Sequence, residues 1–166
     1  MTGEGAVRLR PPRNAVDRRA VAWWRTRCLM ATAAPAAVLG LLGALVGPAR
    51  TWLVPAAALV AVAGLAGTAF LPLWWFRVHR WEVTDEAVYV RTGALWQEWR
   101  IAPLSRIQTV DTVRGPLEQL FRLGTVTVTT ASSKGALRIE GLDHELAAAL
   151  GERLTSLTQA TPGDAT

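Results

Sequence analysis

The sequence has few of the residues from which active sites and metal centres are built. It contains one cysteine, Cys28, and two histidines, His79 and His144, which are far apart in the sequence. One cysteine cannot form a disulfide framework or a cysteine-based metal site within a single chain. The sequence also lacks a phosphate-binding P-loop and a dinucleotide-binding fingerprint. We therefore expect neither enzymatic activity nor a cofactor or metal.

Charge is absent from two long segments in the first half of the chain. Residues 28–49 and 51–76 contain 22 and 26 residues without a charge, with Arg50 between them. Both exceed the roughly 20 residues that a helix needs to cross a bilayer. The alternative is that both segments are buried helices of a soluble protein. In so short a chain, the remaining residues would provide too little polar surface to cover two such helices. A signal peptide would place its small-residue cleavage site after the apolar segment, but Ala31–Ala33 lies at its beginning.

The two segments therefore predict a transmembrane helical hairpin over residues 23–77, with spans at about 28–49 and 51–76. Neither span has an ionisable residue, so we expect no transport or pumping by this chain alone. Glycines recur in both spans and predict close packing of one helix against the other. The alternative use of these glycines is the formation of a homo-oligomer. They are Gly40, Gly43, Gly47, Gly64 and Gly67.

Tryptophans flank both spans, and this residue is enriched at membrane interfaces. Trp52 and Trp74 lie 22 positions apart, which corresponds to about 33 Å of helix at 1.5 Å per residue. That length matches one bilayer crossing. The predicted interface anchors are Trp23, Trp24, Trp52, Trp74 and Trp75.

Basic residues indicate the orientation of the hairpin. Residues 1–27 contain seven arginines and two acidic residues, and Arg77 and Arg80 follow the second span, whereas the opposite turn has Arg50 alone. Because cytoplasmic flanks of membrane helices are rich in Lys and Arg, we expect a multi-pass protein of the cell membrane with both termini cytoplasmic. Residues 77–166 carry a net charge of −1, so the basic character lies elsewhere and we expect no nucleic-acid binding.

From Arg80 to Glu140 the apolar pattern alternates with a period of two, which is typical of strands with one buried face. Four clear strands are expected, near residues 81–84, 88–91, 125–129 and 137–140. Residues 95–101 and 107–113 have strand composition but a less regular pattern, and Trp96 and Trp99 are candidates for core, interface or partner contacts. After Gly141, Leu146, Leu150, Leu154 and Leu157 predict an amphipathic helix that caps the sheet.

Several motifs occur in order along this region. They are WEVTDE at 81–86, TG at 92–93, IAPLSRIQTV at 101–110, GPLEQLFRLGTV at 115–126, TAS at 130–132 and IEGL at 139–142. In these motifs the chain resembles the bacterial pleckstrin-homology-like (PH-like) domain family of YdbS-type membrane proteins. The resemblance implies an α+β membrane protein, in which the hairpin precedes a PH-like antiparallel sheet or partial barrel capped by a C-terminal helix.

The resemblance also places individual residues in recurring family segments. The first segment includes Pro103, Ile107, Gln108 and Val110, and the second includes Pro116, Leu117, Phe121 and Gly124. We expect these residues to specify the fold more than to bind a ligand, with Gly124 in a turn that starts a strand and with Ile107 and Val110 partly buried. We count about six strands where the family has seven, which predicts an incompletely closed barrel.

The expected domains are a basic flexible tail (1–22), the hairpin (23–77), the PH-like domain (78–158) and a disordered tail (159–166). The expected function is a membrane-anchored scaffold or accessory module that binds a protein partner, such as a longer membrane relative with repeated PH-like domains. Alternatives are binding of an anionic lipid headgroup and an accessory role in envelope stress or export. Candidate lipid or partner contacts are Arg77, Arg80, Arg91, Arg100 and Arg106.

Overall fold

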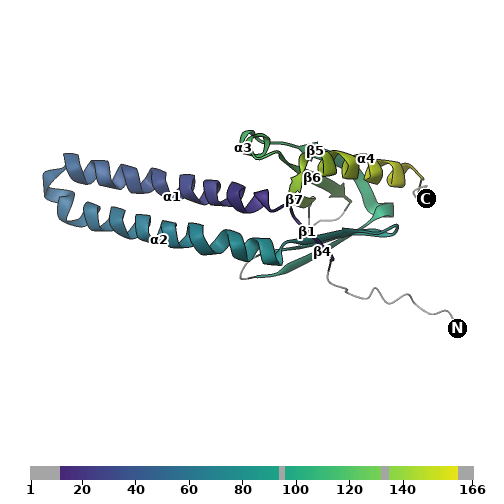
Figure 1. Cartoon of the computed structure of the whole chain (residues 1–166), viewed down its shortest axis with the longest axis horizontal. Helices are drawn as coiled ribbons and strands as arrows, with labels where there is room; N and C mark the ends of the chain where they lie inside the picture. The colour runs from purple at the N-terminus through teal and green to yellow at the C-terminus, as the bar shows by residue number, and fades with distance from the viewer. Residues whose placement is uncertain (1–11, 94–95, 132–134, 161–166) are drawn as a thin grey trace.

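The protein consists of a long helical hairpin with a β domain at one end, in a computed structural model that describes residues 12–93, 96–131 and 135–160 (Figure 1). The elements, in chain order, are β1 (Asn14–Ala15), α1 (Arg19–Leu45), the 3₁₀ helix η1 (Gly47–Ala49), α2 (Arg50–Val78), β2 (Arg80–Val83), β3 (Ala87–Thr92), β4 (Glu98–Pro103), the 3₁₀ helix η2 (Leu104–Arg106), β5 (Ile107–Val113), α3 (Pro116–Leu120), β6 (Leu123–Thr130), β7 (Leu137–Asp143) and α4 (His144–Ala160).

Helices α1 and α2 are each long and apolar enough to cross a membrane. Only 6% of the most apolar part of either helix is buried in the protein. The helices expose leucines and valines that a buried helix of a soluble protein would cover. This exposure is the arrangement expected of helices whose apolar side chains face lipid.

Two glycines allow the helices of the hairpin to approach each other closely. A Cβ atom added at Gly43 would lie 3.0 Å from Val54 Cγ2, and one added at Gly64 would lie 2.5 Å from Thr32 Cβ. At Gly40, by contrast, an added Cβ would meet nothing within 4 Å. The predicted use of glycine for packing within the hairpin therefore holds for Gly43 and Gly64.

The β domain contains two antiparallel sheets, with strand orders β1-β2-β3-β4 and β5-β6-β7. Buried residues alternate along the strands as the sequence pattern predicts, and the inward positions form the core between the sheets. They include Trp81, Val88, Val90, Ala102, Val126, Val128, Leu137 and Ile139. Ile107 and Val110 are partly buried against this core, as expected.

The N-terminal part of the described chain differs from the flexible tail predicted for residues 1–22. Asn14 pairs with Trp81 and Ala15 with Arg80, so β1 extends the first sheet. Val16 and Ala20 are 6% and 0% exposed, and α1 already begins at Arg19. The predicted tail is wrong from residue 12 onward, while residues 1–11 lie outside the described residues. The strand missing from the sequence-based count comes from before the hairpin.

Helix α4 caps the second sheet, but its apolar face is rotated from the predicted leucine stripe. Ala147, Leu150 and Leu154 are buried, whereas Leu146 is 44% exposed. Gly124 is the second residue of β6, so it lies at the start of a strand as expected, but within the strand and not in a turn. A Cβ added there would be only 3.0 Å from Ala147 Cβ. Close approach of α4 therefore explains this glycine. Of the predicted tail 159–166, residues 159 and 160 belong to α4 and the remainder lies outside the described residues.

Candidate functional site

Three of the five candidate arginines use their guanidinium groups to bind backbone carbonyls. Arg80 Nη1 donates to the Phe76 carbonyl at 3.0 Å, and Arg91 Nε donates to the Val78 carbonyl at 3.0 Å. These bonds fasten the end of α2 to the first sheet. Arg77 and Arg106 are exposed. Arg80 and Arg91 are cross-strand partners, so the structure brings these two candidates together. Both side chains, however, bind carbonyls of the protein itself.

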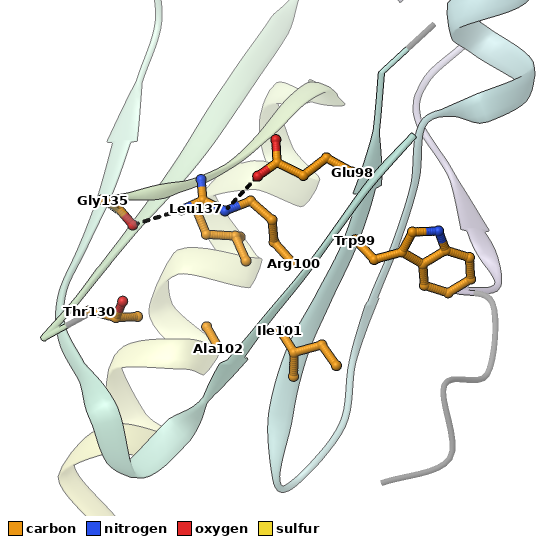
Figure 2. A pocket seen from close by; sticks show the side chains of 8 residues that line it. All are labelled: Glu98, Trp99, Arg100, Ile101, Ala102, Thr130, Gly135 and Leu137. Carbon is orange, nitrogen blue, oxygen red and sulfur yellow. Dashed lines mark hydrogen bonds and ion pairs between the residues drawn. The ribbon is translucent and has the colours of Figure 1, made fainter. Parts of the chain in front are cut away.

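Arg100 connects β4 to the segment just before β7, and no strand ladder joins the two sheets within the described parts of the chain. Its Nη1 donates to the Ala136 carbonyl at 2.7 Å and its Nη2 donates to the Gly135 carbonyl at 2.9 Å (Figure 2). Glu98 Oε1 lies 3.7 Å from Arg100 Nε. A cavity of about 170 Å³ lies beside this bridge, between β4 and the start of β7. The expected gap in the barrel is therefore spanned by a side chain.

The opposite face of β4 is apolar and exposed. Trp99 and Ile101 are 39% and 36% exposed, and Trp96, just before the strand, is 88% exposed. Figure 2 shows Trp99 projecting away from Arg100. The Arg91 guanidinium lies 5.6 Å from the Trp99 ring centroid, within the range of a cation–π contact. We call Trp96, Trp99 and Ile101 the β4 apolar strip.

A second concave feature lies where the hairpin meets the β domain. This junction cleft has a volume of about 380 Å³ and is lined by Trp24, Arg27, Cys28, Ala31, Trp75, His79 and Glu140. The residues come from α1, from the end of α2 and from β7. Sequence analysis did not single out Arg27 or Glu140. Arg27 could have been recognised in the sequence by its position, because it is the last charged residue before the first span.

His79 is a partly buried polar group at this junction. Its Nδ1 lies 2.9 Å from the Trp75 carbonyl, so the ring nitrogen donates there and Nε2 is left as an acceptor. The ring centroid lies 5.1 Å from that of Trp24. Burial lowers the pKa of His79, although the hydrogen bond to Trp75 and the charge of Glu140 oppose this shift. The imidazole is therefore neutral at pH 7.

The predicted tryptophan anchors divide into two groups. Trp23 and Trp24 are 5% and 4% exposed and belong to the core, so the fold covers the side chains that were predicted to anchor the membrane interface. Trp24 makes an edge-to-face contact with Trp75, with ring centroids 5.9 Å apart. Trp52 and Trp74 are 81% and 53% exposed and lie near opposite ends of α2. Their role as anchors stays a prediction.

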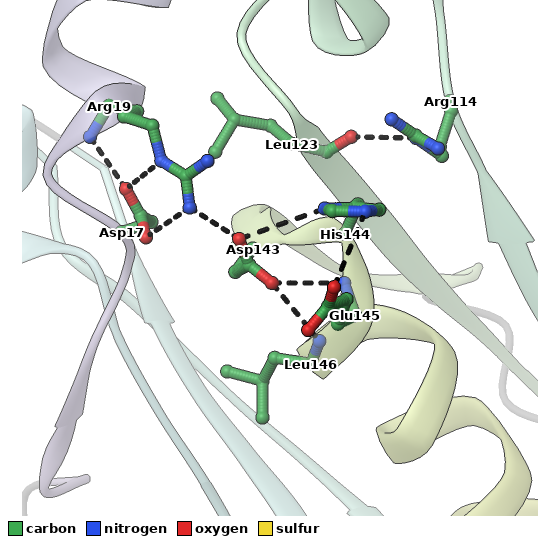
Figure 3. A network of polar contacts seen from close by, with 8 residues as sticks. All are labelled: Asp17, Arg19, Arg114, Leu123, Asp143, His144, Glu145 and Leu146. Atoms are coloured by element: carbon green, nitrogen blue, oxygen red, sulfur yellow. Dashed lines mark hydrogen bonds and ion pairs between the residues drawn. The ribbon is translucent and has the colours of Figure 1, made fainter.

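A polar network fixes the start of α1 to the second sheet (Figure 3). Arg19 forms ion pairs with both Asp17 and Asp143, and the Asp17 amide donates to the Gly141 carbonyl at 2.8 Å. The hydrogen bond from Arg19 lowers the pKa of Asp17, against the opposing effect of burial. Asp143 Oδ1 also accepts a hydrogen bond from the Glu145 amide at 3.0 Å, at the start of α4. This network has a structural role.

The sequence is similar to known bacterial membrane proteins. The model of the bacterial PH domain family matches residues 34–158, which is more than half of the chain. The UPF0699 transmembrane protein YdbS of Bacillus subtilis (strain 168) is 32% identical over 88 residues. This match covers 53% of the chain and 54% of YdbS, so it spans about half the length of that relative. No solved structure matches the chain.

Proposed function

This chain belongs to the bacterial PH domain family, and we propose that it is a membrane-anchored interaction module whose β domain binds a protein partner. In this proposal the hairpin crosses the membrane twice, both termini are cytoplasmic, and the domain acts without catalysis. The proposed partner is a longer membrane protein that carries PH-like domains. The observation that supports the proposal is the β4 apolar strip.

The strip has the composition and position of a binding surface. β4 is an outer strand of its sheet, and its Glu98, Arg100 and Pro103 are residues of the kinds that discourage pairing of a strand edge with other chains. Its exposed face instead offers Trp99 and Ile101, with Arg91 against the Trp99 ring. Tryptophan and arginine are enriched among the residues that contribute most to protein interfaces. A partner would remove this apolar surface from water.

The arginine geometry favours a protein over an anionic lipid as the ligand of the β domain. An arginine that binds a lipid phosphate must direct its guanidinium donors toward the lipid. Arg80, Arg91 and Arg100 instead donate to backbone carbonyls. Only Arg77 and Arg106 of the five candidates are fully on the surface.

The proposal can be tested in native membranes with a photo-cross-linking amino acid at position 96. We expect a cross-link to one protein of the same family, and stoichiometric co-purification of that protein in mild detergent. The double variant Trp99→Ala, Ile101→Ser should reduce co-purification at least tenfold, because truncation of interface hot spots costs about 2 kcal/mol or more.

Leu120→Ser is the matched control, since Leu120 is 73% exposed on α3 and lies outside the strip. It should leave co-purification unchanged. The proposal fails if the strip variant, shown to be folded by circular dichroism, still binds the partner at the wild-type level. A cross-link only to a second copy of this chain would also contradict it.

A further inference from the structure

The junction cleft lies at the boundary between the charge-free part of the hairpin and its charged end. Cys28 and Ala31 belong to the first charge-free segment, whereas Arg27 is the charged residue directly before it. On the other helix, Trp75 lies within the charge-free segment and His79 just beyond it. With the hairpin in a membrane, the cleft would therefore have one apolar half and one half at the level of the lipid headgroups.

The charged half of the cleft carries one cation and one anion. Among the described residues, neither Arg27 nor Glu140 has a side-chain hydrogen bond or an ion pair, although the Arg27 guanidinium lies 5.0 Å from the Trp23 ring centroid. His79 adds no charge at neutral pH, because burial lowers its pKa. Both charged groups are thus available to a ligand that itself carries one charge of each sign.

We propose that the junction cleft binds a zwitterionic aminophospholipid of the phosphatidylethanolamine type. Arg27 contacts the lipid phosphate and Glu140 contacts its ammonium group, while the apolar half accommodates the beginning of an acyl chain. The site is separate from the β4 apolar strip, and the inference rests on membrane insertion of the hairpin without requiring the proposed protein partner.

The chemistry of the cleft fits this ligand. Arginine binds phosphate through charge-assisted hydrogen bonds, and a carboxylate is the natural acceptor for an ammonium group. The aromatic rings of Trp24 and Trp75 also suit an ammonium or an acyl chain. The volume of about 380 Å³ falls within the range of about 300–1,000 Å³ that is common for ligand sites. A headgroup with net negative charge would be repelled by Glu140.

The experiment uses the full chain, purified in mild detergent and stripped of lipid, with binding followed by native mass spectrometry. Phosphatidylethanolamine and phosphatidylglycerol with identical acyl chains are titrated separately. We expect one phosphatidylethanolamine per chain and much weaker binding of phosphatidylglycerol. The variants Glu140→Gln and Arg27→Gln should each weaken phosphatidylethanolamine binding about tenfold or more, as expected for the loss of a charge-assisted hydrogen bond.

Glu145→Gln and Arg25→Gln are the matched controls, because both residues are exposed and outside the cleft. They should bind lipid as the wild type does. Glu140→Gln should also reduce the ratio of phosphatidylethanolamine affinity to phosphatidylglycerol affinity. A purely structural role of Glu140 would not change this ratio. Equal binding of both lipids to the wild type, no retained lipid, or unchanged phosphatidylethanolamine binding by Glu140→Gln would each overturn the inference.

Discussion

At the scale of single residues, His79 lies where the hairpin meets the β domain, and its burial there favours the neutral form. The side chain packs against Trp24 and donates to the Trp75 carbonyl. Because burial lowers its pKa in the folded protein, protonation is more favourable in the unfolded chain. The contribution of neutral His79 to the free energy of unfolding is therefore complete above the unfolded pKa of about 6.5. This contribution is lost as the pH falls through the lower pKa of the folded protein.

We expect the thermal unfolding midpoint in detergent to be lower at pH 5.5 than at pH 7.5. His79→Asn keeps a donor near the Trp75 carbonyl but does not titrate, so its midpoint should depend less on pH over this interval. If wild type and His79→Asn show the same pH dependence, His79 is not the titrating group.

Gly64 makes the tightest contact within the hairpin, since a Cβ added there would lie 2.5 Å from Thr32 Cβ. A Cβ atom cannot move aside as the end of a flexible side chain can. Gly64→Ala should therefore destabilise the hairpin by about 1–3 kcal/mol, the usual cost of overpacking. Thermal unfolding in detergent would measure this loss.

Gly40→Ala is the matched substitution on the other helix, because an added Cβ there meets nothing within 4 Å. It should be neutral or slightly stabilising, as alanine favours a helix over glycine. Equal effects of the two substitutions would show that helix propensity, and not close packing, determines the outcome.

At the scale of elements, β1 shows that the β domain includes residues before the hairpin. Val16, directly after this strand, is 6% exposed in the core of the domain. Val16→Ala should lower the stability of the β domain by about 1–2 kcal/mol, because it removes buried methyl groups. Arg13→Ala alters an exposed residue nearby and should have little effect.

The measurement for this pair is thermal unfolding followed by near-ultraviolet circular dichroism, which reports the packing of Trp81 and the other aromatic residues. A wild-type transition for Val16→Ala would show that the segment before the hairpin does not contribute to the domain.

The elements predicted correctly from the sequence have strong periodic patterns. The charge-free segments identified both long helices, and alternating apolar residues identified β2, β3, β6 and β7, whereas β4 and β5 were expected from strand composition alone. The β1 strand was missed because two residues cannot display an alternation, and its partner lies on the other side of the hairpin. The buried face of α4 was predicted to include Leu146, but Ala147 is buried in its place. The small side chain of Ala147 lies where the helix approaches Gly124.

The candidate site was harder to predict than the fold, because residue type does not reveal the contact that a side chain makes. Trp23 and Trp24 suggested a membrane interface but are buried in the core. Arginines that suggested a lipid site bind backbone carbonyls. The junction cleft combines residues from α1, α2 and β7, so it exists only in the folded chain.

At the scale of the whole molecule, the proposed orientation predicts opposite environments for the C-terminus and the hairpin turn. Alkaline phosphatase, which is active only outside the cytoplasm, should be inactive when fused after Thr166. The same enzyme inserted into η1 should be active. Immunoblots would establish equal expression of the two fusions, and an active C-terminal fusion would reverse the proposed topology.

In the proposed topology, the pairing of β1 with β2 requires that both helices of the hairpin cross the membrane and not just one of them. During synthesis β1 emerges before the hairpin, and its contact Trp81 follows Ala15 by 66 residues, after the entire hairpin. A chain that inserted only one of its two helices would leave these strands on opposite sides of the membrane. Its first sheet would then expose an unpaired β2 edge, a surface prone to aggregation. Formation of the first sheet is thus incompatible with insertion of a single helix of the hairpin.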